Sequence, residues 1–340
     1  MSMRKIFKSR AVKILVVVLC VGAIKFRGVF TAPVAAGEYA PWFQQNLKPD
    51  DIEGMLNKNP ARIDEVNQEG FTGLMFAIRD GYPDNARVFI KKGAMLDSTA
   101  KNDFIMRDPA SRTREENENE RYYRTTALHM ALMNANDDTN YVIAKDLILG
   151  IKRNDGTIAK ANVQVKNGVG FTPLHTVVAS IETDDYNTQD PLRNRRIEFI
   201  KLLMDAVGNK EAQEGYLNAQ DNDGNTILHI LAQRNALNTI EWLISTYGRM
   251  LKLDIRNKPT AANNVGKIQY PNGMTPAELA RESGYGAACA GRLDVELKRY
   301  NDKSISEENY KNNPKFNDIV PPTPIYDPAT APMSKPAPGS

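Results

Sequence analysis

Histidine is the side chain best suited to acid–base chemistry near neutral pH, and three histidines occur among the 340 residues of this chain. His129, His175 and His229 lie 46 and 54 residues apart. A zinc site would have to bring such ligands within about 2 Å of one ion. Catalysis would need an imidazole within hydrogen-bonding reach of a reacting group. Each histidine instead ends the same four-residue element, so we expect all three to be structural.

The repeated element has the form Thr-X-Leu-His. The complete copies are Thr126-Ala127-Leu128-His129, Thr172-Pro173-Leu174-His175 and Thr226-Ile227-Leu228-His229. The degenerate copies are Thr72-Gly73-Leu74-Met75 and Thr275-Pro276-Ala277-Glu278. In four of the five copies a glycine lies two residues before the threonine, and the exception is Arg124; these glycines are Gly70, Gly170, Gly224 and Gly273. The copies therefore predict one local structure that is repeated five times.

Each position of the element suits a turn that leads into a helix. Gly224 suits a backbone with positive φ, which a side chain would oppose. Thr226 is a good N-cap, and Pro173 fits a first helical turn, where no amide donor is missed. Leu228 then begins an apolar face. Apolar segments downstream predict a second helix in the first four repeats, at Phe89-Ile90, Leu147-Ile148-Leu149, Ile200 to Leu203 and Trp242-Leu243-Ile244, with Gly93 as a helix C-cap.

This pattern resembles the ankyrin repeat, in which a turn and a Thr-Pro-Leu-His element lead into a pair of helices. The resemblance implies an all-α ankyrin-repeat solenoid of helix-turn-helix units, with about five repeats plus a leading half-repeat over residues 41–66. It also implies that each histidine bonds to neighbouring backbone and ties adjacent turns together. The three imidazoles would then lie in successive layers of the stack, too far apart to share one metal ion.

The repeats are longer than an ankyrin unit of about 33 residues. The aligned positions 74, 128, 174, 228 and 277 are separated by 54, 46, 54 and 49 residues, so every unit carries an insertion. We expect most insertions to project from the turn side, because extra loop there leaves the stacked helices undisturbed. The turn-side insertions are expected at residues 98–123, 154–161, 209–215 and 258–271, and one between paired helices at residues 182–194.

The amino end, residues 1–36, predicts an export signal. An apolar run from Ile14 to Ile24 follows a basic start, and as a helix it would span about 16 Å of a bilayer core of roughly 30 Å. That length favours a cleaved signal peptide, with a cleavage signal at Val34-Ala35-Ala36, and an uncleaved N-terminal anchor is the alternative. Residues 37–297 would form the repeat domain. Residues 298–340 are predicted to be a Pro-rich disordered tail, with eight prolines from Pro314 onward.

Charge and cysteine content argue against two properties, nucleic-acid binding and an internal disulfide. The formal net charge is +3, but residues 1–36 hold seven basic residues and no acidic one, which leaves 37 basic and 41 acidic residues. Nucleic-acid binding is therefore disfavoured. A processed chain would keep Cys289 without Cys20, so it would have no internal disulfide. We interpret Cys289 as a small buried helix residue.

Other candidate motifs for chemistry are weak. Nucleophile-elbow, phosphate-loop and zinc-protease motifs are missing from the sequence. Asp221 to Asn225 faintly resembles the start of a calcium loop, but Ala232 occupies the position of the distal glutamate. We therefore expect no cofactor and no metal. An acidic block at 115–120 and a basic block at 193–196 have two interpretations, solvated loops or partner-facing patches.

The function these observations favour is a non-enzymatic protein–protein interaction scaffold, exported from a bacterial cell or exposed on its surface, with a host protein as a reasonable partner class. The alternatives are a membrane-tethered periplasmic assembly factor, which would touch a membrane through residues 14–24, and an enzyme built on the insertions. The resemblance implies that partners contact turn tips and the ends of the first helices. The tip residues would be Gln68, Glu69, Tyr123, Val169, Asn222 and Asp223. The first-helix residues would be Arg79, Asp80, Met133, Asn134, Gln233, Arg234 and Glu282.

Overall fold

The computed structural model describes residues 40–44, 46–67, 70–100, 124–133, 135–181, 190–259, 272–283 and 286–302. These ranges hold twelve α-helices and a two-stranded sheet, so the expectation of a mainly helical, all-α protein is confirmed. No helix within them is both long and apolar enough to cross a membrane. The predicted leader, residues 1–36, and residues 303–340 of the predicted tail lie outside the described ranges.

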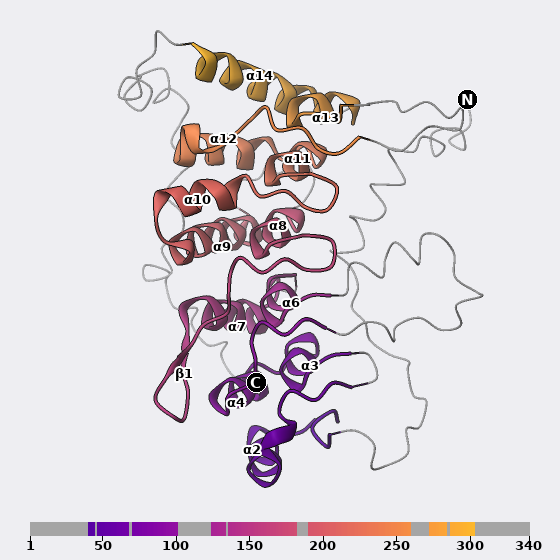
Figure 1. Ribbon diagram of the computed structural model, residues 1–340, viewed down its shortest axis with the longest axis vertical. Helices are drawn as coiled ribbons and strands as arrows, with labels where there is room; N and C mark the ends of the chain where they lie inside the picture. The colour runs from indigo at the N-terminus through magenta and orange to yellow at the C-terminus, as the bar shows by residue number, and fades with distance from the viewer. Residues whose placement is uncertain are drawn as a thin grey trace, which may run out of the picture.

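Five helix pairs, here called units 1 to 5, follow one another along the long axis of the molecule (Figure 1). The first helices are α3 (Gly73–Arg79), α6 (Ala127–Met133), α8 (Pro173–Ala179), α11 (Ile227–Gln233) and α13 (Pro276–Glu282). The second helices are α4 (Pro83–Lys91), α7 (Asp138–Leu149), α9 (Pro191–Val207), α12 (Leu237–Tyr247) and α14 (Ala287–Asn301). Each first helix packs against the first helix of the next unit. Contacts between helices therefore occur mainly within a unit and between adjacent units.

The repeated element forms the start of each first helix, as expected. Thr72, Thr172 and Thr275 are N-caps whose hydroxyl oxygens accept the amide of the third helical residue. Pro173 and Pro276 begin their helices, where proline loses no hydrogen bond. The second residue of each first helix is then buried. That residue is the repeated leucine in units 1 to 4.

The core is built from the leucine position of the element. Leu74, Leu128 and Leu174 are fully buried, and Leu228 is 1% exposed. They belong to one apolar cluster that runs through all five units and includes Cys289 on α14. Burial of an apolar side chain of this size contributes about 1.5–3 kcal/mol. The leucines therefore contribute to the packing that holds the units together.

The start of the described chain covers the open end of unit 1, where a leading half-repeat was expected. Helix α2 (Pro49–Lys58) packs against α4, and a short 3-10 helix, η2 (Pro60–Arg62), follows it. Trp42 is 1% exposed, and its ring meets that of Phe89 edge-on at 6.1 Å. Trp42 and helix α2 therefore cover the apolar face of unit 1, before which the described chain has no further helix pair.

Two of the insertions expected on the turn side lie elsewhere. Residues 154–161 belong to a hairpin of β1 (Ile151–Lys152) and β2 (Ile158–Ala159), which directly follows α7. Residues 209–215 fall in α10 (Lys210–Leu217), which follows α9 and packs against it and against the 3-10 helix η5 (Gly248–Met250). The expectation is wrong for both, because each continues from the end of a second helix, on the opposite side from the turns (Figure 1).

The other insertions are described only at their edges. The amide of Ala100 donates to the carbonyl of Thr125, and that of Asn257 donates to the carbonyl of Met274. These bonds join the described residues on either side of the segments 101–123 and 260–271, within which the sequence predicts insertions. Residues 101–123, which hold the acidic block 115–120, and residues 182–189 and 260–271 lie outside the described ranges.

The basic block at residues 193–196 is neither a loop nor an exposed patch. It lies in the first turns of α9, and Arg193 and Arg196 are buried. The guanidinium of Arg196 donates to the hydroxyl of Ser180 and to the side-chain oxygen of Asn136. Both interpretations of this block are therefore wrong, because Arg193 and Arg196 are buried and Arg196 connects unit 3 to unit 2 through its hydrogen bonds.

Helix α14 continues past residue 297, where the repeat domain was expected to end. The hydroxyl of Tyr300 donates to the carbonyl of Gly248 in η5. Asn301 is the last helical residue. The folded body therefore includes the first residues of the segment that was predicted as tail.

Candidate functional site

In units 1, 3, 4 and 5 an Asn or Asp side chain accepts an amide from the turn before the first helix. In unit 3 the side-chain oxygen of Asn167 accepts the amides of Val169 and Phe171 at 3.1 and 2.9 Å. Asp221 does the same in unit 4, accepting the amides two and four residues later at 2.9 and 2.7 Å. Asx side chains favour such turns because they replace a backbone acceptor. The residues that faintly resembled a calcium loop therefore form a turn.

Adjacent turn tips are hydrogen-bonded to one another. The Asn222 amide donates to the carbonyl of Val169 at 2.9 Å, and its side chain donates to the carbonyl of Gly168 at 2.9 Å. The Lys258 amide donates to the carbonyl of Asp223 at 2.7 Å. Gly170 has φ +82°, and a Cβ there would lie 2.6 Å from the Asn222 nitrogen. The tips of units 3, 4 and 5 thus form one continuous ridge.

Each histidine joins its own turn to the next one. In unit 2 the Thr126 hydroxyl lies 2.9 Å from Nδ1 of His129, and Nε2 lies 2.9 Å from the carbonyl of Phe171 in unit 3. The other two histidines repeat this arrangement, with the carbonyl of Asn225 at 3.4 Å from His175 and that of Met274 at 2.9 Å from His229. The three imidazoles therefore contact three different carbonyls and do not converge.

The protonation of these histidines follows from their partners. In each unit the threonine amide donates to Nδ1, at 3.4, 3.3 and 3.1 Å in units 2 to 4. Nδ1 must then be the acceptor, so the proton sits on Nε2 and is donated to the carbonyl. Burial lowers the pKa of all three histidines to about 4. The imidazoles are neutral at physiological pH.

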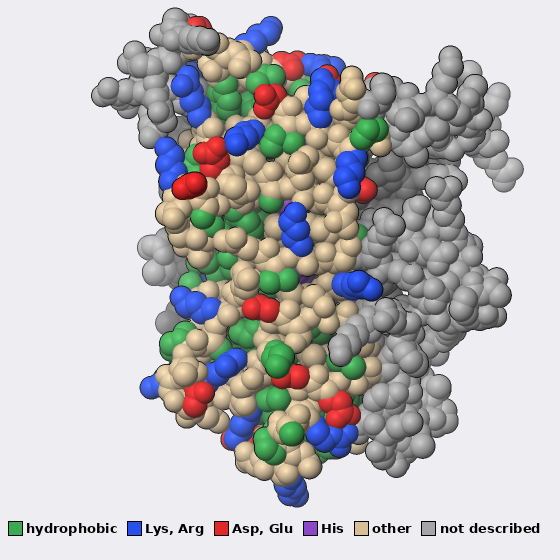
Figure 2. All heavy atoms as spheres, in the orientation of Figure 1, with side chains coloured by type: hydrophobic (Ala, Val, Ile, Leu, Met, Phe, Trp, Pro, Cys, Tyr) green, Lys and Arg blue, Asp and Glu red, His purple; other side chains and the backbone are tan. Residues whose placement is uncertain are grey.

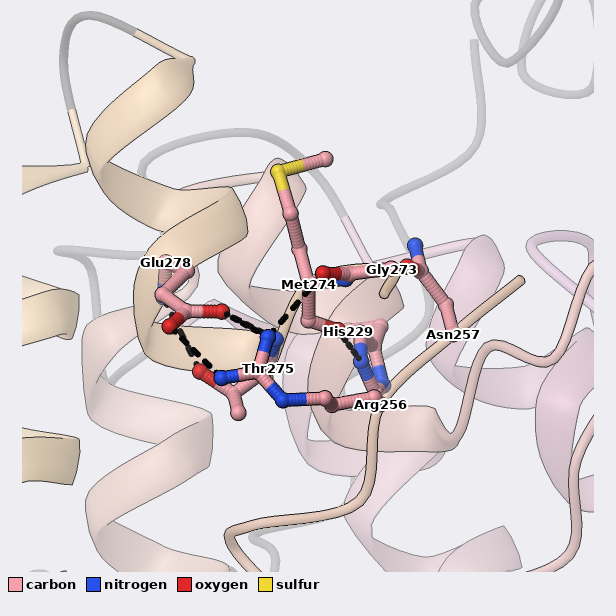
Figure 3. Close-up of polar contacts among 7 residues, drawn as sticks. All are labelled: His229, Arg256, Asn257, Gly273, Met274, Thr275 and Glu278. Carbon is pink, nitrogen blue, oxygen red and sulfur yellow. Dashed lines mark hydrogen bonds and ion pairs between the residues drawn. The ribbon is translucent and has the colours of Figure 1, made fainter. Parts of the chain in front are cut away.

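In unit 5 a carboxylate replaces the imidazole (Figure 3). Glu278 accepts the amide of Thr275 at 2.9 Å, as Nδ1 does in the earlier units. Arg256 donates to both carboxylate oxygens, at 2.8 and 3.0 Å. The Thr275 amide, and then Arg256, hold the pKa of Glu278 below its usual range. Glu278 closes its own turn but, unlike histidine, has no N–H for a following carbonyl.

The predicted tip residues fall into three groups. Gln68, Glu69 and Tyr123 lie outside the described residues. Val169 and Asn222 are engaged in the ridge through the bonds given above. Asp223 is exposed, and its carboxylate makes no hydrogen bond or ion pair within the described chain. Asp223 is thus the predicted tip residue with unused hydrogen-bonding capacity.

The predicted first-helix residues line the ends of α3, α6, α11 and α13. Arg79 lies over the rings of Phe71 and Phe76, at 5.3 and 4.9 Å from their centroids, and pairs with Asp80 at 2.7 Å. Its guanidinium is therefore held in place by ring faces and a carboxylate.

The remaining first-helix residues differ in how far they are engaged. Arg234 donates to the carbonyl of Ile181 at 2.6 Å. Met133 is half-buried against the core, and Asn134 lies outside the described residues. Gln233 is half-buried and Glu282 is exposed, and neither side chain is bonded within the described chain. The structure thus leaves Gln233 and Glu282 available, and it places them on different layers of the stack.

The sequence interpretation missed one residue, on the inserted helix α10, that helps to position the first helix of unit 3. The hydroxyl of Tyr216, on the inserted helix α10, donates to the carbonyl of Val163 at 2.6 Å and accepts the amide of Leu174 at 3.1 Å. It thereby satisfies a free amide in the first turn of α8. Burial raises the pKa of Tyr216. The available signal was an aromatic residue directly after the polar segment 209–215.

Within the described ranges no three His, Cys, Asp or Glu side chains are grouped so that they could hold a metal ion. No protein-family model matches the chain, and no curated protein matches it in sequence. The repeated residues of the chain and their contacts are therefore the basis for a functional proposal.

Proposed function

We propose that the chain is an ankyrin-repeat solenoid that acts as a non-enzymatic scaffold for binding another protein. The resemblance in sequence supports the repeat assignment, and so does the geometry of the histidines. A threonine, a histidine and a carbonyl of the next unit recur in units 2, 3 and 4 with the same atoms in the same roles. Such recurrence is expected when one structural unit is repeated and stacked.

The observation that carries the binding proposal is a set of polar side chains, Asp223, Gln233 and Glu282, that no hydrogen bond or ion pair engages within the described chain. On the second helices, charged side chains bridge adjacent units, as Arg87 does to Asp146 at 2.8 Å and Lys145 to Glu198 at 2.7 Å. On the turn side, Asp223, Gln233 and Glu282 have no such partner within the described chain. Polar groups at the rim of an interface are typical of transient protein complexes. The partner would lie along the ridge and the first-helix ends.

Photo-crosslinking from defined positions tests this proposal. A crosslinking amino acid at 223, 233 or 282, in protein returned to its native cells or their host, should capture one and the same partner. Matched positions are Asp205 on α9 and Thr246 on α12, which are exposed on second helices. Capture from these two positions and none from the first three would contradict the proposal.

Export is the second part of the proposal and rests on the sequence of residues 1–36. Loss of about 36 residues from the native protein, seen by intact-mass measurement, is expected for a cleaved export signal. A full-length chain in the membrane fraction would support the alternative, a membrane-tethered periplasmic assembly factor. A host protein is the partner class that an exported bacterial scaffold of this kind would meet.

A further inference from the structure

The hairpin after α7 has a defined turn. Arg153 and Thr157 close it, with the Arg153 amide donating to the Thr157 carbonyl at 2.8 Å. Gly156 has φ +88°, and Asp155 accepts both the amide and the hydroxyl of Thr157. A three-residue loop that ends in a left-handed glycine is a common hairpin connection. The side chain of Asp155 is therefore already hydrogen-bonded within the turn.

The hairpin is fixed to the stack by one of its faces. The guanidinium of Arg153 donates to the carbonyl of Ala94 at 3.0 Å, and the Asn154 amide donates to that of Lys91 at 3.0 Å. Ala159 is 5% exposed, and the amide of Ala161 donates to the carbonyl of Leu147 at 2.9 Å. The hairpin therefore presents its other face in a set orientation.

That other face combines cations with exposed apolar side chains. Lys152 and Ile158 are paired across the strands, so they share a face. Gly150 has no side chain, and atoms of Ile158 and Lys160 lie 2.6 and 2.8 Å from the position a Cβ would take there. Leu149, the last residue of α7, is 53% exposed and Ile158 is 59% exposed. Lys152, Ile158 and Lys160, together with Leu149 just before the hairpin, are here called the hairpin face.

The two lysines of the hairpin face have no acidic partner within the described chain. Lys152 and Lys160 are exposed, and neither ammonium makes an ion pair or a hydrogen bond within the described chain. The nearest acid on α7, Asp146, pairs with Arg87. The face thus offers two unpaired cations beside two apolar side chains that water must solvate.

We propose that the hairpin face binds an anionic membrane surface. Lysines meet lipid phosphates while apolar side chains enter the boundary between headgroups and acyl chains, which is the arrangement found in interfacial membrane segments. A soluble polyanion would use the lysines but would gain little from exposed isoleucine and leucine. The hairpin lies on the second-helix side, away from the turn tips (Figure 1). Membrane contact would therefore leave the proposed partner surface accessible, and it does not depend on residues 14–24.

Vesicle sedimentation with the full chain tests this inference. Vesicles of phosphatidylcholine with added phosphatidylglycerol serve as the probe. Replacing both lysines, Lys152→Ala with Lys160→Ala, should weaken binding about thirtyfold, since each lysine near such a surface contributes about 1 kcal/mol. Ile158→Ser should weaken it about tenfold, because a half-exposed isoleucine loses part of its transfer from water.

Matched variants separate the hairpin from general effects. Val295 on α14 is 53% exposed and Lys298 on the same helix is exposed, so Val295→Ser and Lys298→Ala should bind as the unaltered chain does. Residues 14–24 are present in every variant, so differences between variants report on the hairpin. Circular dichroism verifies that each variant is folded.

Three results would overturn the proposal. The first is equal binding of the anionic vesicles by the hairpin variants and the unaltered chain. The second is an equal loss in the α14 variants. The third is binding that depends on the lysines but not on Ile158 and is competed by soluble polyglutamate, which would assign the lysines to an acidic protein. Because the crosslinking positions lie on the other side of the stack, none of these results bears on the proposed scaffold function.

Discussion

Histidine ends the repeated element in units 2, 3 and 4, whereas glutamate ends it in unit 5 and methionine in unit 1. The comparison separates two structural roles of the last residue of the element, here called its two tasks. The first is to close its own turn, and the second is to bond to the next unit. Nδ1 of His229 closes its own turn and Nε2 reaches the next unit, at Met274. Glu278 closes its turn in the same way but bonds Arg256 from its own unit. Within the described chain α13 and α14 are the last helix pair, so no later unit there offers a carbonyl for the second task.

Acid should weaken the three histidine units together, and this is the largest effect we expect. The folded-state pKa of about 4 lies below the ordinary value of 6.5. Between these values the unfolded chain binds protons that the folded chain does not, so stability falls as pH drops from about 6.5 toward 4. At pH 5 the loss is about 2 kcal/mol per histidine, or roughly 6 kcal/mol in all.

Urea unfolding at a series of pH values measures this effect. A triple variant, His129→Asn, His175→Asn and His229→Asn, should be less stable at pH 7.5 but lose less between pH 7.5 and pH 5. An unchanged pH dependence in that variant would show that the histidines are not the titrating groups.

Removing a core leucine should produce the next largest loss. Leu228 is 1% exposed between units, so Leu228→Ala should lower the free energy of unfolding by roughly 2–5 kcal/mol. The exposed Val295→Ala on α14 is the matched control and should change it by less than about 0.5 kcal/mol. A loss of that small size for Leu228 would mean that the register of the repeats is misassigned.

Replacing the histidine and the glutamate singly sharpens the comparison between unit 4 and unit 5. His229→Ala leaves the Met274 carbonyl and the Thr226 amide without this partner, and should cost about 1–3 kcal/mol. Glu278→Gln keeps an acceptor for the turn and loses a half-exposed ion pair, so it should cost less than about 1 kcal/mol. Chemical denaturation at pH 7.5 compares the two, and equal losses would contradict the two-task interpretation.

A loss smaller than the one expected for His229→Ala concerns the inserted helix α10. Tyr216→Phe removes a buried hydroxyl that serves Val163 and Leu174, and it should cost about 1–2 kcal/mol. Tyr247→Phe is a suitable control, because that hydroxyl forms no hydrogen bond within the described chain. Equal melting temperatures for both variants would show that the Tyr216 hydroxyl does not help to attach α10.

Parts of the fold were accessible from the sequence because local rules govern them. The positive φ of Gly170 and Gly224, the threonine N-caps and the C-terminal Gly93 each depend on residues within one turn. The hairpin at Asn154-Asp155-Gly156 carried a usable signal, since Asp and Gly favour such turns, but its position among the repeats suggested a turn-side loop. For the proposed partner residues, the sequence suggested where to look and the contacts then showed that Asn222 is already bonded.

The sequence by itself determined the repeated turn, its cap and the apolar face that follows, because these need only the preferred dihedral angles and hydrogen bonds between residues a few positions apart. Only the tertiary structure decided which carbonyl each histidine meets, 42 to 50 residues away. It also decided that Arg193 and Arg196 are buried and that two insertions project from the second helices. These outcomes depend on how separate segments pack against one another, and no local pattern specifies that packing.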